Sequence, residues 1–413
     1  MIKEGTIAVN GREYRLPSKP VAVICIDGCA NEYLDIGIAK GLMPNLQKIV
    51  RTGFKCMARG ALPSFTNVNN ASIVTGAPPK IHGLPGNFFL DPESGEEVMM
   101  NSSIYLRSET ILAEASKAGR KVAFVTAKNK LLELFSKGIT GICFSSEKAG
   151  EATLQKNGID NVEEMVGPTP PIYSPDASVY ALKAGAELVN RGLADFLYLS
   201  LTDFMQHTYA PEAPESLKFY QDIDTQIGKL LDLGTIVGGT ADHGMNGKAD
   251  KDGNPKVIYV QSLLEEKFGE GFKVILPITD PYVKHHGALG SYGVVHLPQD
   301  SSVTQKQVID FIWSIDGITE VLEKEIAAKN LELPLDRLGD IIIMSARDVA
   351  IGRKPEHHNL DELDAPLRSH GGRYEEMVPF FTSMPVNHDY YLKAQGDIRN
   401  FDIFDFTLNG GNA

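Results

Sequence analysis

Short, uninterrupted apolar runs alternate along the chain with longer amphipathic segments, and this alternation limits the fold more than any other feature. The run at residues 21–26 reads VAVICI, and comparable runs lie at residues 121–126, 196–200, 235–238 and 341–344. Helices are expected between them, at residues 44–52, 177–191 and 212–232. Strands without a polar face are typical of parallel sheets covered by helices on both sides. The sequence therefore predicts an α/β fold with a mostly parallel central sheet flanked by helices.

Residues 253–340 break this rhythm. A polar, turn-rich stretch at residues 244–256 is followed by the short β-like runs VIYV, KVILPI and GVVHL. Helices are expected around residues 306–315 and 319–329. We interpret residues 253–340 as a smaller α+β cap inserted into an α/β core formed by residues 1–252 and 341–413. The chain is expected to re-enter the main sheet at Ile341.

Charge limits the partners that the protein can bind. The chain has 40 lysine and arginine residues against 53 aspartate and glutamate residues, a net charge of −13. Nucleic acids and anionic membrane surfaces would be repelled overall, so neither is expected as a partner. A small anionic substrate is compatible with this charge, because local cations outweigh distant ones. The sequence is compatible with more than one oligomeric state, and a homodimer is among them.

The compartment is predicted from what the sequence lacks. The first residues, MIKEGTIAVNGREYRLP, contain no apolar run typical of a signal peptide. No stretch approaches the roughly 20 apolar residues that a membrane-spanning helix needs. Four cysteines in 413 residues do not resemble a disulfide framework. We therefore expect a cytoplasmic protein whose thiols are mostly buried.

The first chemically suggestive residue is Asp27, which follows the apolar run VICI and precedes Gly28. Ligands collect at the carboxyl ends of parallel strands. A carboxylate at that position, beside a glycine that allows close backbone approach, suits a metal cation. The alternative is an aspartate that caps a helix or stabilises a turn.

The second is Thr66, in the segment LPSFTNVNNASIVTG. The residues after it are expected to form a short helix that ends at Gly76. A hydroxyl at a helix N-terminus is usually a capping group. The same position also suits a nucleophile, because the free N–H groups of the first turn stabilise an attacking alkoxide and the phosphoryl group that it receives.

Two further segments supply carboxylate and imidazole groups. Asp203 and His207 follow the run FLYLSL and lie four residues apart, so on a helix they share one face and can bind one ion. Asp242 and His243 are adjacent in a glycine-rich turn, and His370 precedes two glycines. Carboxylate and imidazole ligands suit Zn²⁺, with Mn²⁺ or Fe²⁺ as substitutes. Three aspartates, three histidines and one threonine are enough for two metal ions that keep open positions for a substrate.

The order of these residues resembles the alkaline phosphatase superfamily. The pattern is an aspartate after a strand, a threonine in an F-T-N context, then D-x-x-x-H, D-H-G and H-G-G, between residue 21 and about residue 385. The chain is most similar to the nucleotide pyrophosphatase/phosphodiesterase-like branch. In that branch a threonine nucleophile precedes S-x-V-T-G, here residues 72–76, and H-G-x-x-x-N, here residues 82–87. The resemblance implies an alkaline-phosphatase-like core.

The resemblance also implies the roles of the individual residues. It assigns Asp27, Thr66, Asp242 and His243 to one zinc ion, and Asp203, His207 and His370 to the other. Thr66 would be the nucleophile that forms a phosphothreonine intermediate. Asn87 would hold an oxygen of the phosphoryl group.

Within the branch, the pattern is similar to enzymes that cleave the carbon–phosphorus bond of phosphonoacetate to give acetate and phosphate. That likeness points to Lys128 and Lys130 in VTAKNKLL. Two lysines at i and i+2 of an extended segment face the same way and would form a two-point site for the substrate carboxylate. Solvent-exposed lysine is the alternative.

Two other functions stay open at this stage. One is a phosphodiesterase or phosphomonoesterase with the same metal ions and another substrate. It gains support if Lys128 and Lys130 point away from the metal ligands. The other is a non-catalytic module that binds a metal or a phosphorylated ligand. The presence of the threonine together with all six Asp and His candidates argues against that function.

Overall fold

Four of the five apolar runs form the centre of a seven-stranded sheet in the computed structural model, which describes residues 2, 4–280, 286–299, 302–363 and 365–411. The strand order is β4 (Phe54–Arg59), β19 (Met377–Thr382), β10 (Ile236–Thr240), β3 (Val21–Cys25), β9 (Phe196–Ser200), β7 (Val122–Thr126) and β8 (Gly141–Ser145). Strands β10, β3, β9, β7 and β8 pair in parallel, and β19 runs antiparallel to both of its neighbours. The predicted α/β fold with a mostly parallel central sheet is confirmed.

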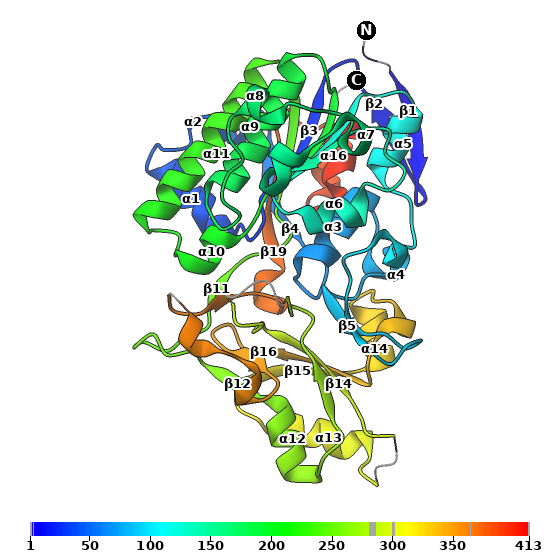
Figure 1. Cartoon of the computed structure of the whole chain (residues 1–413), viewed down its shortest axis with the longest axis vertical. Helices are drawn as coiled ribbons and strands as arrows, with labels where there is room; N and C mark the ends of the chain where they lie inside the picture. The colour runs from blue at the N-terminus through cyan, green and yellow to red at the C-terminus, as the bar shows by residue number, and fades with distance from the viewer. Residues whose placement is uncertain (1, 3, 281–285, 300–301, 364, 412–413) are drawn as a thin grey trace.

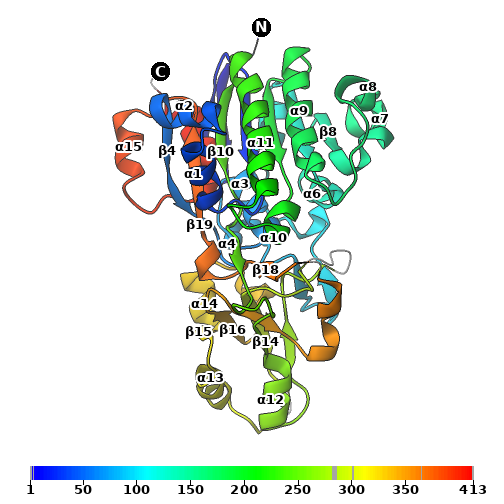
Figure 2. The ribbon, with the colours of Figure 1, turned by 90° about the vertical axis from the view of Figure 1, so that its left-hand side faces the viewer.

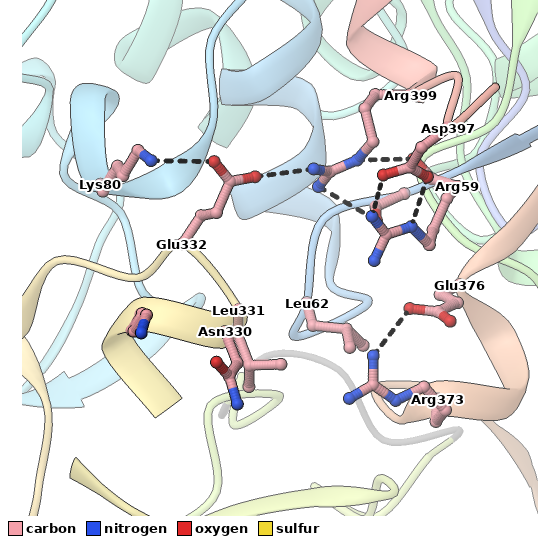
Figure 3. Close-up of a pocket in the computed structure, with 12 residues that line it drawn as sticks. Arg59, Leu62, Lys80, Asn330, Leu331, Glu332, Arg373, Glu376, Asp397 and Arg399 are labelled. Atoms are coloured by element: carbon pink, nitrogen blue, oxygen red, sulfur yellow. Dashed lines mark hydrogen bonds and ion pairs between the residues drawn. The ribbon is translucent and has the colours of Figure 1, made fainter. Parts of the chain in front are cut away.

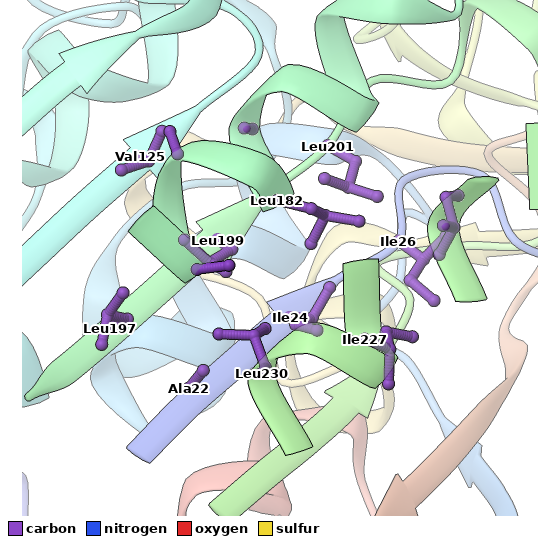
Figure 4. Packing of buried hydrophobic residues seen from close by; sticks show 14 of the residues in the cluster. Ala22, Ile24, Ile26, Val125, Leu182, Leu197, Leu199, Leu201, Ile227 and Leu230 are labelled. Carbon is purple, nitrogen blue, oxygen red and sulfur yellow. The ribbon is translucent and has the colours of Figure 1, made fainter. Parts of the chain in front are cut away.

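Helices cover both faces of this sheet because successive residues of each strand point to opposite sides. Ala22 and Ile24 of β3 pack in a buried cluster with α1 (Asn31–Ala39), α2 (Pro44–Thr52), α9 (Asp176–Asn190) and α11 (Pro214–Asp232). Figure 4 shows part of this cluster, including Leu182 of α9 and Leu230 of α11. Val21 and Val23 face the other cluster, which includes residues of α3 (Thr66–Thr75), α5 (Ile111–Lys117), α6 (Asn129–Phe135) and α16 (Ile403–Asn409).

A second layer of structure lies below the main sheet in Figures 1 and 2. It contains a four-stranded antiparallel sheet in the order β13 (Lys273–Ile275), β14 (Tyr292–His296), β16 (Ile341–Ser345) and β15 (Ile318–Glu323). Helices α12 (Val260–Phe268) and α13 (Gln305–Trp313) pack on it. The same cluster includes Leu62 and Phe65 from the loop before α3, so the cap sheet is packed directly against the segment that leads to Thr66.

Two expectations for the cap are wrong. The strand at Ile341 does not return to the main sheet but lies inside the cap sheet, and the chain next enters the main sheet at β19. A fully apolar run indicates a central strand in either sheet, so the run could not show which sheet it joins. Residues 319–329 are not one helix, because β15 occupies the first half and α14 (Lys324–Asn330) the second. The division of the chain at residues 253 and 340 stays a prediction.

No helix in the described part of the chain combines the length and apolar character that crossing a membrane requires.

Candidate active site

The predicted aspartates come together because their strands are neighbours. Strands β10, β3 and β9 are adjacent and parallel, with Cys25 paired to both Thr240 and Ser200. Asp242, Asp27 and Asp203 follow the carboxyl ends of these strands by two or three residues, and all three are buried. Gly28 has a φ of +69°, and a Cβ there would lie 2.9 Å from Asp203 Cβ. The turn after Asp27 therefore needs glycine to let two of the loops approach each other.

Thr66 is the first residue of α3, and its hydroxyl does not cap that helix. The N-cap position is occupied by Phe65, whose side chain cannot accept a hydrogen bond. The Thr66 hydroxyl instead lies 3.4 Å from Nε2 of His243. As expected, α3 ends at Gly76, which has a left-handed φ of 62°. The capping role is thus excluded, and the hydroxyl faces the Asp/His cluster.

The structure brings five of the six Asp and His candidates into two overlapping groups. Asp203, His207 and His370 form one group of ligand atoms within 4.8 Å of one another, and Asp27, Asp203 and His243 form the other. His207 Nε2 lies 2.9 Å from Asp203 Oδ2, and His243 Nε2 lies 3.2 Å from Asp27 Oδ1.

Asp242, expected beside Asp27 and His243, has its Oδ2 3.8 Å from His243 Nε2. Asp203 lies between the two groups and contributes to both. A carboxylate in this place has two oxygens and can serve two cations at once. The assignment of each ligand to one ion stays a prediction.

The three histidines present the same ring nitrogen to the cluster. In His207, Nδ1 lies 2.7 Å from the carbonyl oxygen of Arg368. In His243 it lies 2.9 Å from the carbonyl oxygen of Gly244, and in His370 it lies 2.7 Å from that of Ser64. A carbonyl oxygen only accepts, so each Nδ1 carries a proton, and Nε2 is the nitrogen that faces the cluster and can bind a cation. Backbone partners that fix the tautomer in this way are typical of histidine metal ligands.

The charge of the cluster also suits metal cations. The two oxygens of Asp27 are buried and accept no hydrogen bond from the described residues. Burial and the adjacent Asp27 carboxylate raise the pKa of Asp242 well above its ordinary value. Burial lowers the pKa of His243, but Asp242 and Asp27 more than offset it and raise that pKa to about 10. This excess of buried negative charge is what divalent cations would neutralise, so the donor set fits two such ions.

Asn87 lies beside the start of α3, close to Thr66 in the fold. Its side-chain oxygen accepts a hydrogen bond of 2.9 Å from the backbone N–H of Asn67, the residue after Thr66. The oxygen is thereby occupied, and the NH₂ group is the end that can donate to a ligand. Asn87 is buried, with 4% of its surface exposed.

The prediction that Lys128 and Lys130 share one extended segment is wrong, because a helix begins between them. Lys128 is the N-cap residue of α6, and Lys130 is in its first turn. Their amines nevertheless reach buried carboxylates: Lys128 Nζ lies 3.0 Å from Asp203 Oδ1, and Lys130 Nζ lies 3.1 Å from Asp280 Oδ2. Burial lowers the pKa of Lys128, but Asp203 and Asp27 more than offset it and raise that pKa, so the amine stays charged. Lys128 therefore points toward the ligand cluster.

Two residues near the site were not predicted from the sequence. Asp280, the partner of Lys130, lies in the predicted cap, and an isolated aspartate in ITDPY carries no signal. The ring of His286 lies 5.3 Å from that of His207, although the two are far apart in sequence.

A separate charged pocket of about 390 Å³ lies where the end of α14 meets the core (Figure 3). Glu332 bridges Lys80 at 3.0 Å and Arg399 at 2.7 Å, and Arg59 pairs with Asp397. The predicted site residues are not among the described residues that line it. The ion pairs of Glu332 connect the cap to the core at this pocket, which is not part of the Asp/His cluster.

A family model matches most of the chain. The model describes type I phosphodiesterase/nucleotide pyrophosphatase and covers residues 21–168 and 176–373, which include every predicted site residue. The chain belongs to this family. The resemblance inferred from the motif order is therefore confirmed at the family level.

Among solved structures, the chain is similar to phosphonoacetate hydrolase from Sinorhizobium meliloti 1021 in complex with phosphonoformate. The two are 43% identical with a TM-score of 0.94, and the match covers 99% of this chain and 100% of that one. The same enzyme in complex with phosphonoacetate matches at 43% identity and a TM-score of 0.93, with the same coverage of both chains. Murine ectonucleotide pyrophosphatase/phosphodiesterase 5 is 15% identical with a TM-score of 0.65 over 96% of each chain, which shows the shared fold alone.

A curated relative in this family is human ectonucleotide pyrophosphatase/phosphodiesterase family member 1. It is 28% identical over 259 residues, which are 59% of this chain and 25% of the relative. The mouse protein of the same name is 27% identical over 225 residues, 52% of this chain and 22% of the relative. The chain thus spans about a quarter of the length of the curated relatives that it matches.

Proposed function

We propose that this protein is a hydrolase that cleaves the carbon–phosphorus bond of phosphonoacetate to give acetate and phosphate. The observation that carries the proposal is the position of the lysine pair. Lys128 Nζ lies 3.0 Å from Asp203, a member of both groups of metal-ligand candidates. A cation beside the phosphoryl site suits a substrate with a carboxylate next to its phosphorus. The full-length likeness to phosphonoacetate hydrolase at 43% identity supports the same substrate.

The cofactor that we propose is a pair of zinc ions held by Asp27, Asp242 and His243 and by Asp203, His207 and His370. Buried imidazole and carboxylate donors suit zinc, and Mn²⁺ or Fe²⁺ are substitutes with similar ligands. When bound, the two ions would neutralise the phosphoryl oxygens and lower the pKa of a hydroxyl beside them.

Thr66 supplies the nucleophile in the first step. Its hydroxyl, which faces His243, loses its proton to solvent, and the oxygen forms a bond to phosphorus while the bond from phosphorus to the methylene carbon breaks. The electron pair of that bond passes to the carbon and is delocalised into the adjacent carboxylate. Lys128 and Lys130 stabilise this charge, and a proton from solvent completes acetate. The NH₂ group of Asn87 donates to a phosphoryl oxygen.

The second step releases phosphate. Water attacks the phosphothreonine, the bond between phosphorus and the Thr66 oxygen breaks, and the threonine hydroxyl is restored. Covalent catalysis of this kind divides one difficult displacement into two easier ones.

The test compares three substrates in one assay: phosphonoacetate, an aryl phosphate monoester and an aryl phosphate diester. Phosphate or phenolate release is measured with and without a chelator. We expect phosphonoacetate to have the highest kcat/KM, and chelation to remove activity on all three. Faster hydrolysis of the diester would instead support a phosphodiesterase, which is what the family model describes.

A further inference from the structure

Asn70 lies one helical turn after Thr66 on α3 and is fully buried. Its side-chain amide makes four hydrogen bonds. Nδ2 donates to the Thr66 carbonyl oxygen at 3.0 Å and to Asp242 Oδ2 at 3.1 Å. Oδ1 accepts from the hydroxyl of Tyr198 at 2.7 Å and from that of Ser200 at 2.9 Å. A carboxamide has two N–H donors and two acceptor lone pairs, so all of its capacity is used.

The orientation of this amide follows from its partners. The Thr66 carbonyl oxygen can only accept a hydrogen bond, so the NH₂ group of Asn70 must face this oxygen. The same NH₂ group then also faces Asp242 Oδ2. Tyr198 faces the other end, and burial raises its pKa well above the ordinary value, so its hydroxyl keeps the proton that it donates. Tyr198 and Ser200 belong to β9, the strand that leads to Asp203. One amide therefore connects α3, β9 and the loop of Asp242.

The hydrogen bonds of Asp242 decide which of its oxygens can bind a cation. Oδ1 accepts from the backbone N–H of Gly28 at 3.2 Å and from that of His243 at 3.1 Å. Each carboxylate oxygen has about two lone pairs, so Oδ1 is filled. Oδ2 accepts from Asn70 and lies 3.8 Å from His243 Nε2, on the side of the ligand cluster. One lone pair of Oδ2 is left for a cation.

We propose that Asn70 is a positioning residue that directs Oδ2 of Asp242 at the metal ion and makes Asp242 a ligand through that single oxygen. The inference rests on the proposed two-metal function and adds a residue to it that the motifs do not contain. Because the same NH₂ group holds the Thr66 carbonyl, Asn70 also sets the distance between the first turn of α3 and the Asp242 loop. The nucleophile and one metal ligand are thus positioned by one side chain.

Asn70→Asp tests this role with little change in volume. It replaces the NH₂ group, which donates to both the Thr66 carbonyl oxygen and Asp242, by a carboxyl group that has no donor when ionised and one when protonated. At least one of the two hydrogen bonds is therefore lost, and the orientation of Oδ2 is disturbed. Thr75→Val is the matched control, since Thr75 is a buried residue of the same helix whose hydroxyl bonds to the Ala71 carbonyl oxygen at 2.7 Å. Thr75 lies five residues further along, about 7.5 Å at a rise of 1.5 Å per residue.

The measurement is the affinity for Zn²⁺, obtained by titrating metal-free protein against a chromophoric chelator, with circular dichroism as a check of folding. We expect one of two zinc sites to weaken by about 10–100-fold in Asn70→Asp, the usual effect of losing an outer hydrogen bond to a ligand. The other site, and both sites of Thr75→Val, should keep the wild-type affinity. Tyr198→Phe, which removes one donor to Asn70, should weaken the same site to a smaller extent.

Wild-type affinity in a folded Asn70→Asp variant would overturn the inference. Equal weakening of both sites would also overturn it, because that result indicates a general structural role. If Asn70→Asp does not fold, Tyr198→Phe decides, and unchanged zinc affinity in that variant counts against the inference. Failure of the wild-type protein to bind two zinc ions would refute the proposed function itself, so the two failures are distinct.

Discussion

The groups expected to act on phosphorus and those expected to act on the carboxylate are held in different ways. We call Thr66, Asn87 and the six Asp and His candidates the phosphoryl side, and Lys128 and Lys130 the carboxylate side. The histidines of the phosphoryl side bond to backbone carbonyls, and Asp242 accepts from backbone N–H groups. The two lysines are long side chains that pair with carboxylates of other segments, Asp203 and Asp280.

This difference indicates that the two sides serve different purposes, catalysis on the phosphoryl side and substrate selectivity on the carboxylate side. Groups tied to the backbone need no reorganisation when charge develops, which suits the phosphoryl chemistry that all candidate substrates share. Lysines paired with carboxylates can exchange those partners for the carboxylate of a substrate, which suits selectivity. Changes on the phosphoryl side should therefore affect every substrate, and changes on the carboxylate side should affect phosphonoacetate most.

The largest effect is expected for Thr66→Ala. Removing a covalent nucleophile should lower kcat by roughly 10⁴-fold or more on phosphonoacetate and on aryl phosphates alike. Thr66→Ser should retain part of the activity because it keeps a hydroxyl. Metal content, measured by elemental analysis, should stay near that of the wild type. Near-normal turnover of Thr66→Ala would remove Thr66 from the phosphoryl side.

Removal of metal is expected to have an effect of similar size and to be equally unselective. A chelator should abolish hydrolysis of phosphonoacetate and of aryl phosphates, and added Zn²⁺ should restore it. Ligands that bind the folded state stabilise it, by about 2.7 kcal/mol at 100 times the dissociation constant, so thermal unfolding should occur at a higher temperature with Zn²⁺. A chelator effect on one substrate alone would contradict a shared phosphoryl side.

Alanine at Lys128 or Lys130 should have a selective effect. A hydrogen bond to a charged group contributes roughly 1.5–3 kcal/mol, so each substitution should lower kcat/KM for phosphonoacetate by about tenfold to over a hundredfold. An aryl phosphate, which has no carboxylate and leaves as a stabilised phenolate, should lose much less. Both kcat and KM should change, because the contact strengthens as charge develops on the departing acetate.

Lys117→Ala is the control for these variants, since Lys117 is an exposed lysine paired with Glu114. It should leave both substrates unaffected. Equal losses on both substrates in the Lys128 and Lys130 variants would assign these lysines to the phosphoryl group or to the fold. No loss on either substrate would remove the main reason for proposing a phosphonate.

The smallest effect is expected away from both sides, at the ion pair of Arg353 with Glu97. The pair has N···O distances of 2.9 and 3.2 Å, and each side chain is 24% exposed. Partly exposed ion pairs contribute about 0–1 kcal/mol, so Arg353→Ala should lower the free energy of unfolding by no more than that. Chemical denaturation gives this value, and kcat/KM should be unchanged for both substrates. A selective loss on phosphonoacetate would extend the carboxylate side to this region.

The sequence predicted the phosphoryl side better than its surroundings. Strands at residues 21–26 and 196–200 could be placed because a fully apolar run followed by an aspartate indicates the end of a parallel strand. The helix that begins at Thr66 and ends at Gly76 also follows from local sequence. Thr66 and the six Asp and His candidates lie together, and their roles as nucleophile and ligands stay a prediction.

Predictions failed where a local pattern is compatible with two structures. Residues 319–329 contain apolar residues that fit either a helix or a strand, and pairing with β16 selects the strand for the first half. Lys128 and Lys130 lie at the start of a helix and do not share one extended segment. Their amines still reach Asp203 and Asp280, because the lysine side chains are long. Asn70 carries no motif signal at all.

The sequence by itself determined the α/β class, the family and the set of side chains available for chemistry. These follow from local patterns: an apolar run forms a strand, and the polar residue after it lies at the edge of the sheet. Only the tertiary structure decided which strands are neighbours, that Ile341 belongs to the cap sheet, and that Asp203 lies between the two ligand groups. It also decided that one amide, that of Asn70, joins Thr66 to Asp242. Contacts between residues far apart in sequence depend on how whole elements pack, and no local pattern encodes that packing.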